Sequence, residues 1–236
     1  MKQEGKKITM LTAYDYTMAH LIDSVGVDIL LVGDSAANVM AGHSTTLPIT
    51  LEQMVYHGAS VVRATEHALV VVDMPFGSYQ VSEEVALSSA VRLMKETGCD
   101  ALKLEGGAIL YPLIKRLTTL GIPVMGHLGL TPQSVHQLGG YHLQGKSEED
   151  ALRLEQEALG LEEAGCFALV LEKVPATLAE RVAKRLHIPV IGIGAGSGVD
   201  GQVLVSQDML GMEESFSPKF LRRFGQVGSA IRTAVG

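Results

Sequence analysis

Two charged side chains lie close together in a segment that otherwise looks like a buried strand. The sequence of residues 100–105 is Asp-Ala-Leu-Lys-Leu-Glu. Side chains alternate along a strand, so Lys103 and Glu105 share one face and the two leucines share the other. Burying a cation and a carboxylate costs free energy unless the two are paired or hold a ligand. This segment is therefore the first indication of a site.

Polar side chains end other apolar runs in the same way. They are Asp34, Asp73, His127 and Glu172, in addition to Lys103 and Glu105. Taken singly, a strand-terminal aspartate is more often a helix cap, a histidine more often a satisfied structural group, and a lysine–glutamate pair simply an ion pair. Parallel strands that close a barrel bring all their carboxyl ends to one rim, where active sites lie. The joint occurrence therefore favours a shared site.

The residue types suggest a reaction. Asp34, Asp73 and Glu105 are hard oxygen donors with no cysteine beside them, which favours Mg²⁺ over Zn²⁺. Lys103 could bind the carboxylate or an enolate oxygen of a 2-oxo acid. Glu172 is then the carboxylate left to act as a general base. The set predicts metal-assisted removal of a proton next to a carbonyl.

The sequence pattern around Lys103 is repeated later in the chain. Residues 96–105 and 163–172 are identical at seven of ten positions, and residues 122–126 match 188–192. The offsets are 67 and 66 residues. This spacing fits two strand–helix units of roughly 30 residues each. A strand–helix–strand–helix block is therefore expected twice.

Eight apolar runs alternate with segments of helical spacing. The runs lie at 8–13, 28–34, 68–75, 100–105, 122–127, 167–172, 188–193 and 203–205. The helices are expected at 14–25, 50–64, 82–97, 109–120, 147–164, 178–186 and 218–235, with a long loop over 35–50. Continuous apolar runs are typical of parallel strands covered on both faces. The pattern predicts a single (β/α)8 (TIM) barrel domain over residues 1–236, with the site at the carboxyl rim of the strands.

An open doubly wound sheet is the main rival fold. Such a sheet commonly carries a Gly-x-Gly-x-x-Gly turn after its first strand, and here that position reads Ala-Tyr-Asp. The glycines at 192, 194 and 196 come too late in the chain and are a weak dinucleotide signal. The closed barrel is therefore preferred.

Composition limits the function classes. The chain has 236 residues, 47% of them hydrophobic, and a net charge of −7. An acidic balance argues against a general nucleic-acid or membrane-surface binder. No run is long and apolar enough for a membrane-spanning helix, and no secretory signal is apparent. Cys99 and Cys166 are expected to be buried free thiols, which fits a reducing cytoplasm.

The chain resembles the ketopantoate hydroxymethyltransferase family. The resemblance spans about residues 8 to 220, and the run His-Leu-Gly-Leu-Thr-Pro-Gln-Ser at 127–134 is its most specific motif. Other matching motifs lie at 12–15, 31–35, 42–43, 46–48, 73–76, 103–107, 139–141, 171–175, 191–196 and 200–202.

The resemblance implies a barrel enzyme that binds Mg²⁺ and takes its one-carbon unit from 5,10-methylenetetrahydrofolate. By residue match, Asp34, Asp73 and Glu105 are the implied metal positions, and Glu172 is the implied proton acceptor. Substrate contacts fall on Asp34, Ser35, Asp73 and Lys103, with His127 in the same mouth. The implied product from 3-methyl-2-oxobutanoate is 2-dehydropantoate, in pantothenate synthesis. A homo-oligomer is also implied, since many members form decamers.

Three departures from the family pattern accompany the resemblance. Ser44 stands where an acidic residue is common, Ser197 follows the glycine turn where asparagine is common, and both ends are short. Two other hypotheses remain at this point. One is a magnesium-dependent lyase or mutase of the phosphoenolpyruvate mutase/isocitrate lyase type, which would carry a cysteine loop near the site. The other is a non-catalytic barrel scaffold, which would have lost the charges at its rim.

Overall fold

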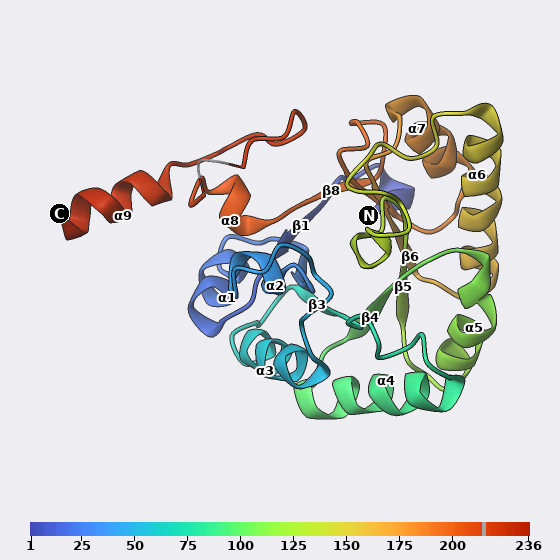
Figure 1. Ribbon diagram of the computed structural model, residues 1–236, viewed down its shortest axis with the longest axis horizontal. Coiled ribbons are helices and arrows are strands. Elements are labelled where there is room, and N and C mark those ends of the chain that lie inside the picture. Colours follow the sequence, from blue (N-terminus) through green and yellow to red (C-terminus); the bar gives the residue numbers. More distant parts are fainter. Residues whose placement is uncertain (214–215) are drawn as a thin grey trace.

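The computed structural model describes residues 1–213 and 216–236 and contains a closed barrel of eight parallel strands (Figure 1). Each strand pairs with the next, and β1 pairs with β8 to close the ring. The strands are β1 Ile8–Thr12, β2 Ile29–Val32, β3 Leu69–Asp73, β4 Ala101–Glu105, β5 Val124–Gly129, β6 Ala168–Glu172, β7 Val190–Ile193 and β8 Gly201–Leu204. The predicted (β/α)8 architecture is confirmed, and the doubly wound alternative is excluded.

Alternate side chains of the strands form two separate cores. The inner core fills the barrel with residues such as Met10, Val71 and Met125. The outer core, which includes Leu102 and Leu104, packs beneath the helices. Burying one such side chain contributes roughly 1.5–3 kcal/mol. The predicted alternation of β4 is confirmed, because its leucines face the helices and its charged residues do not.

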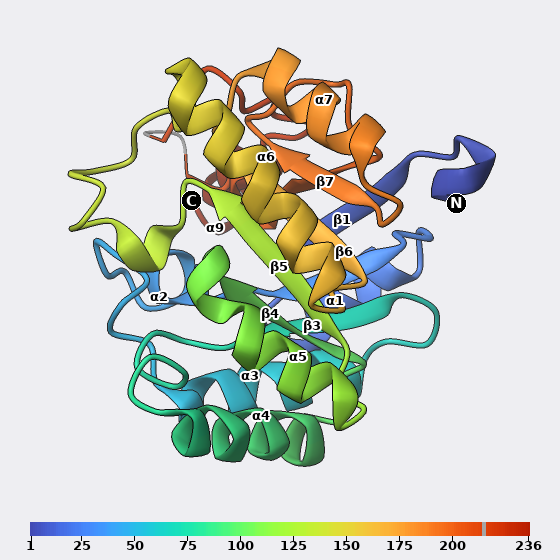
Figure 2. The same ribbon diagram turned by 90° about the vertical axis from the view of Figure 1, so that its right-hand side faces the viewer.

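Helices surround the barrel, and Figure 2 shows α5 and α6 lying outside β5. The helices are α1 Tyr16–Asp23, α2 Ala36–Val39, α3 Leu51–Val62, α4 Glu83–Thr97, α5 Tyr111–Thr119, α6 Glu148–Glu163, α7 Ala176–Arg185, α8 Ser206–Met209 and α9 Val227–Val235. Single turns of 3-10 helix occupy Lys2–Glu4, Ala108–Leu110 and Pro132–Ser134. None of the helices in the described part of the chain has the length and apolar character needed to cross a membrane.

Local capping explains where the better-predicted helices begin. Thr50 accepts a hydrogen bond from the Gln53 N–H while the Gln53 side chain accepts one from the Thr50 N–H, which is a complete capping box. Ser82 and Ser147 begin α4 and α6 with the first of these two bonds: the Ser82 side chain accepts from the Val85 N–H, and the Ser147 side chain accepts from the Asp150 N–H. These caps place the helix starts where the sequence predicted them.

Two expected segments differ from the structure. The loop over 35–50 contains the short helix α2, and the helix expected over 218–235 begins only at Val227. The earlier part of that segment is tied to α8 instead: the Phe224 N–H donates to Met209 O at 2.8 Å and the Val227 N–H to Leu210 O at 2.9 Å. These amides bond carbonyls elsewhere in the chain, so a continuous helix cannot form.

The seam between β8 and β1 is the least covered part of the barrel. Only the four-residue helix α8 directly follows β8, while α9 projects away from the barrel (Figure 1). The outward side chains of Thr9 and Gln202 are exposed, and those of Leu11 and Leu204 are only half-buried. Outward residues of the other strands, such as Leu30 and Leu104, are fully buried.

Candidate active site

The predicted site residues converge on the carboxyl ends of neighbouring strands. Strand register aligns Asp73 with Lys103 and Glu105 with His127. Glu172 ends β6 on the next strand along. These side chains continue the inward-facing rows that lower in the barrel hold apolar residues. The strand alternation therefore gives the inner barrel an apolar floor and a charged mouth.

Lys103 is the centre of the charged cluster. Its Nζ lies 2.9 Å from Asp73 Oδ1, 3.2 Å from His127 Nδ1 and 3.7 Å from Glu105 Oε1. Burial alone would lower the pKa of Lys103, but the charges of Asp73, Glu105 and Asp34 outweigh it and raise that pKa above its usual value. Lys103 therefore stays cationic and offers a fixed positive charge to an anionic substrate.

Glu105 is fully engaged on both oxygens. Its Oε1 lies 3.3 Å from His127 Nδ1, and its Oε2 accepts a hydrogen bond of 3.0 Å from the Gln133 N–H. Burial pushes the pKa of Glu105 up, but His127, Lys103 and that N–H bring it below its usual value. The lowered pKa makes Glu105 a weaker base, which argues against it as the proton acceptor.

His127 lies between the cluster of Lys103 and Glu105 and the more open Glu172. Its Nδ1 can accept from Lys103 in the neutral ring or donate to Glu105 in the protonated one, while Nε2 lies 3.5 Å from Glu172 Oε2. Burial and Lys103 lower the pKa of His127, but the two glutamates outweigh them and raise it to about 9. The protonated ring, donating to Glu105, is the form this geometry favours at neutral pH.

Asp34 and Asp73 share the opposite side of the mouth. The Asp34 N–H donates to Asp73 Oδ2 at 3.0 Å, and Asp34 Oδ2 accepts from Gln133 Nε2 at 2.9 Å. Burial raises the pKa of Asp34 well above its usual range, and the charges of Glu105 and Asp73 add to this. Burial also raises the pKa of Asp73, despite Lys103. Negative charge is therefore under-compensated here, as expected beside a cation site.

The donor set suits a small hard cation. Asp73 Oδ1 is buried and accepts no directed hydrogen bond, since its contact with Lys103 is that of an ion pair. Within residues 1–213 and 216–236, no three His, Cys, Asp or Glu side chains are gathered into a ready metal cage. Mg²⁺ commonly binds through one or two carboxylates and keeps other positions for water and substrate. The residues therefore fit Mg²⁺ held by few protein ligands.

Ser35 lies beside Asp34 at the start of the loop after β2. Its hydroxyl is hydrogen-bonded to the hydroxyl of the buried Tyr14 at 2.8 Å. A Cβ on Gly33 would come within 2.6 Å of Ser35 Oγ and 3.7 Å of Asp73 Oδ2. Glycine at position 33 thus lets Ser35 and the Asp73 carboxylate approach the same backbone turn.

Glu172 is the most open carboxylate of the mouth. The next residue, Lys173, has a φ of 45°, the left-handed conformation that non-glycine residues rarely adopt. The Lys173 N–H donates to Ile193 O at 2.8 Å, while Leu130 donates to Glu172 O at the same distance. The neighbouring Gly129 leaves no room for a side chain, since a Cβ there would lie 2.2 Å from Glu172 O. The backbone beneath Glu172 is therefore fixed from both neighbouring strands.

Two buried residues of the mouth were missed by the sequence analysis, Gln133 and Tyr79. Tyr79 O–H donates to Gln133 Oε1 at 2.6 Å, and both residues contact Glu105. Gln133 lies within the specific run 127–134, so its place in that motif could have marked it as a residue of the site. Tyr79 offers no comparable signal, because nothing in the loop 74–82 marks it as buried.

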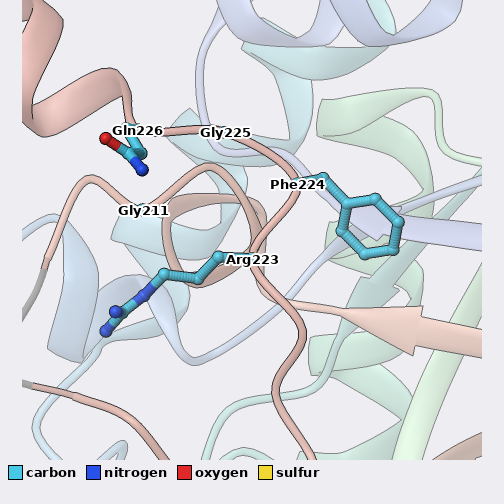
Figure 3. A pocket seen from close by; sticks show the side chains of 5 residues that line it. All are labelled: Gly211, Arg223, Phe224, Gly225 and Gln226. Atoms are coloured by element: carbon cyan, nitrogen blue, oxygen red, sulfur yellow. The ribbon is translucent and has the colours of Figure 1, made fainter.

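A separate cavity lies away from these residues, at the C-terminal segment. It has a volume of about 640 Å³ and is lined by Gly211, Arg223, Phe224, Gly225 and Gln226 (Figure 3). Arg223 donates to Phe216 O at 3.0 Å, and the Phe224 ring lies 4.9 Å from the guanidinium of Arg222. None of the residues that the sequence marked for chemistry lines this cavity.

Sequence relatives share one name. A family model described as ketopantoate hydroxymethyltransferase matches residues 1–236. A Parabacteroides distasonis protein named 3-methyl-2-oxobutanoate hydroxymethyltransferase is 62% identical over 235 residues, which is 100% of this chain and 86% of that protein. A Flavobacterium johnsoniae protein of the same name is 60% identical over 236 residues, or 100% of this chain and 87% of that protein.

Solved structures of other names share the fold. A phosphoenolpyruvate phosphomutase from Streptomyces platensis subsp. rosaceus has a TM-score of 0.68 at 12% identity, covering 97% of this chain and 83% of that one. An oxaloacetate acetylhydrolase in complex with oxalate has a TM-score of 0.67 at 12% identity, with 98% and 81% covered. At such low identity the likeness shows the fold alone.

Proposed function

Since the chain belongs to the ketopantoate hydroxymethyltransferase family, we propose that it transfers a hydroxymethyl group from 5,10-methylenetetrahydrofolate to 3-methyl-2-oxobutanoate, giving 2-dehydropantoate. The observation that carries this proposal is the division of the mouth. One side holds Asp34 and Asp73 around Lys103, and the other holds the more open Glu172. Such a division suits a reaction in which one region binds an anion and another removes its proton.

Asp34 and Asp73 are the residues proposed to hold Mg²⁺. When bound, the ion would draw electrons from the 2-oxo acid and so acidify the C–H bond next to its carbonyl. Asp73 Oδ1, whose one ionic contact among the described residues is with Lys103, and the raised pKa values of both aspartates support this assignment. Glu105, also matched to a metal position, already accepts hydrogen bonds and contacts Lys103. We propose that Glu105 adds a negative charge beside the ion and holds Lys103 and His127 in place.

Glu172 is the proposed proton acceptor. It takes the C3 proton of 3-methyl-2-oxobutanoate, and His127 Nε2, at 3.5 Å, stabilises the carboxylate before that step. Lys103 and Ser35 hold the 2-oxo acid from the other side, where the lysine charge balances the developing negative charge. C3 then bonds to the methylene carbon of the folate, water supplies the hydroxyl oxygen, and both bonds from that carbon to the folate nitrogens break. The C3 proton and one proton of the water pass to those two nitrogens, which gives tetrahydrofolate.

The lyase or mutase alternative is disfavoured by the cysteines. Cys99 and Cys166 are both buried and free, and each precedes the start of a strand, β4 and β6 respectively. They lie at the end of the barrel opposite the charged mouth. No cysteine is therefore available to act beside Lys103 or Glu172. The non-catalytic scaffold is disfavoured as well, since every charged residue expected at the rim is present there.

The experiment is a product assay with the purified protein. With 3-methyl-2-oxobutanoate, 5,10-methylenetetrahydrofolate and Mg²⁺, we expect 2-dehydropantoate and tetrahydrofolate in equal amounts. Omitting the folate or chelating the metal should abolish product. Product formation that is unchanged by chelation would contradict the metal assignment, and no product under complete conditions would contradict the proposed function.

A proposed homo-oligomer is checked separately by sedimentation of the same preparation.

A further inference from the structure

Gln133, which follows β5, contacts residues at the ends of three other strands, β2, β3 and β4. Its backbone N–H donates to Glu105 Oε2 at 3.0 Å, and its side-chain Nε2 donates to Asp34 Oδ2 and to Met74 O, each at 2.9 Å. Its Oε1 accepts from Tyr79 O–H at 2.6 Å and from Gln80 Nε2 at 3.1 Å. The side chain is buried, and every polar atom of its amide is used.

Only one direction of the Gln133 amide satisfies these partners. Met74 O is a carbonyl that can accept but cannot donate, so it requires the NH₂ group, and Asp34 Oδ2 accepts from the same group. A flipped amide would point its oxygen at both of them and leave two buried acceptors unpaired, which is costly. The amide therefore holds one oxygen of Asp34 in a fixed place.

Tyr79 favours the same direction of the amide, because its hydroxyl donates to the amide oxygen of Gln133. Its hydroxyl accepts the Glu105 N–H at 3.2 Å and donates to Gln133 Oε1 at 2.6 Å, with Glu105 O as a longer second acceptor at 3.3 Å. The ring is buried, and the shorter of the two donated contacts is the one to Gln133. The hydrogen bonds thus run in one sense, from Glu105 through Tyr79 and Gln133 to Asp34.

We propose that Gln133 is a positioning residue that fixes the Asp34 carboxylate in the mouth, and that Tyr79 acts through it by setting the direction of its amide. Gln133 occupies Asp34 Oδ2, and among the described residues no hydrogen bond engages the other oxygen, which is left for the ligand. This inference rests on the proposed function, in which Asp34 binds the divalent ion and the 2-oxo acid. It assigns no contact with substrate to either residue.

The first test replaces Gln133 with a side chain of similar length and no hydrogen bonds. Groups that orient metal ligands typically account for 10–100-fold in metal affinity or activity. For Gln133→Met we expect Mg²⁺-dependent binding of 3-methyl-2-oxobutanoate, measured by calorimetry without folate, to weaken by about that factor. KM should rise by a similar factor, while kcat at saturation should change several-fold less, because Glu172 is untouched.

The second test uses Tyr79→Phe, alone and together with Gln133→Met. Losing one buried hydrogen bond is expected to weaken binding by about five-fold. If Tyr79 acts through Gln133, the double variant should bind within about twofold of Gln133→Met alone, since coupled residues are not additive. Tyr111→Phe is the matched control, because it removes a hydroxyl that donates to Glu157 O at 3.1 Å on the helix layer. It should leave binding unchanged.

The outcomes separate this inference from the proposed function. If the unaltered protein shows no metal-dependent binding of the 2-oxo acid, both fail. If it binds and the variants bind equally well, or if the double variant is fully additive, only the positioning roles are overturned. Should Gln133→Met not fold, Tyr79→Phe decides alone: weaker binding relative to Tyr111→Phe supports the inference, and equal binding overturns it.

Discussion

The ends of β4 and β6 come from two copies of one sequence pattern and carry different chemistry. Residues 96–105 and 163–172 are identical at seven of ten positions, and each copy ends in a glutamate. Glu105 has 2% of its side chain exposed and contacts Lys103, His127 and the Gln133 N–H. Glu172 has 18% exposed, and its one ionic contact among the described residues is His127 Nε2 at 3.5 Å.

One substitution between the copies accounts for most of the difference. Two residues before the glutamate, on the same inward face, β4 has Lys103 and β6 has Val170. The lysine brings Asp73 and Glu105 into one cluster, while the valine belongs to the apolar inner core. Equivalent backbones thus deliver one carboxylate into a charged cluster and another, with fewer contacts, that we propose accepts a proton.

The largest contrast is expected when each glutamate becomes glutamine. Glu172→Gln should lower turnover by about 10²–10⁴-fold with 2-oxo acid binding nearly intact, as for loss of a general base. Glu105→Gln should instead weaken metal-dependent binding by about 10–100-fold. Steady-state kinetics and calorimetry on both variants check this. The same profile from both would mean that the two copies do not have separate roles.

A smaller contrast, in stability, is expected at the residue pair that differs. Lys103→Met removes the cation from buried Asp73 and Glu105 and should destabilise the metal-free protein by about 3–5 kcal/mol. Val170→Ala opens only a small cavity in the inner core and should cost about 1–2 kcal/mol. Urea unfolding of both variants measures the difference. Equal losses would show that Lys103 does not organise the carboxylates around it.

The glycines that precede the two strands offer a contrast within the repeat. Gly98 has a φ of 74°, and a Cβ there would meet only Val62, at 3.6 Å. Gly165 has a φ of 105°, and a Cβ would lie 2.8 Å from Thr118 Oγ1. Gly98→Ala should cost about 1 kcal/mol, whereas Gly165→Ala should cost about 2–3 kcal/mol because a neighbour must also move. An equal shift in unfolding midpoint would contradict this difference.

The cysteines of the two copies should differ least. Burial raises the pKa of the Cys166 thiol to about 12 and raises that of Cys99 as well. A raised pKa disfavours the thiolate and burial keeps the reagent away from both thiols, so alkylation of the folded protein should be slow at both sites. Mass spectrometry after iodoacetamide treatment checks this. Rapid labelling with loss of activity would bring back the lyase interpretation.

Much of the fold was accessible from sequence because burial in a parallel barrel leaves a strong pattern. Runs such as 29–33 and 68–72 are free of charged and polar side chains, and each is followed by an aspartate that the structure places at the mouth. Capping residues such as Thr50 also gave the helix starts. The segment 218–226 was wrongly expected to be helical: the Phe224 N–H bonds Met209 O at the end of α8, and the Val227 N–H just after the segment bonds Leu210 O.

The site was predictable where strand alternation governs it and unpredictable where loops do. Lys103, Glu105 and His127 follow from their positions on β4 and β5. The bonds that Gln133 and Tyr79 make depend on how loops after β5 and β3 fold over the mouth, and no periodicity reports this. The different surroundings of Glu105 and Glu172 likewise could not be predicted, because the two residues occupy equivalent positions in the repeat and differ in exposure and in contacts.

The central claim is that the charged mouth removes the C3 proton of 3-methyl-2-oxobutanoate with Glu172 as the base. The direct measurement is deuterium exchange at C3, followed by proton NMR in deuterated buffer with Mg²⁺ and without folate. The unaltered protein should exchange this proton, and Glu172→Gln should not, although it still binds the 2-oxo acid. Exchange retained by Glu172→Gln, or no exchange by the unaltered protein with bound substrate, would contradict the account.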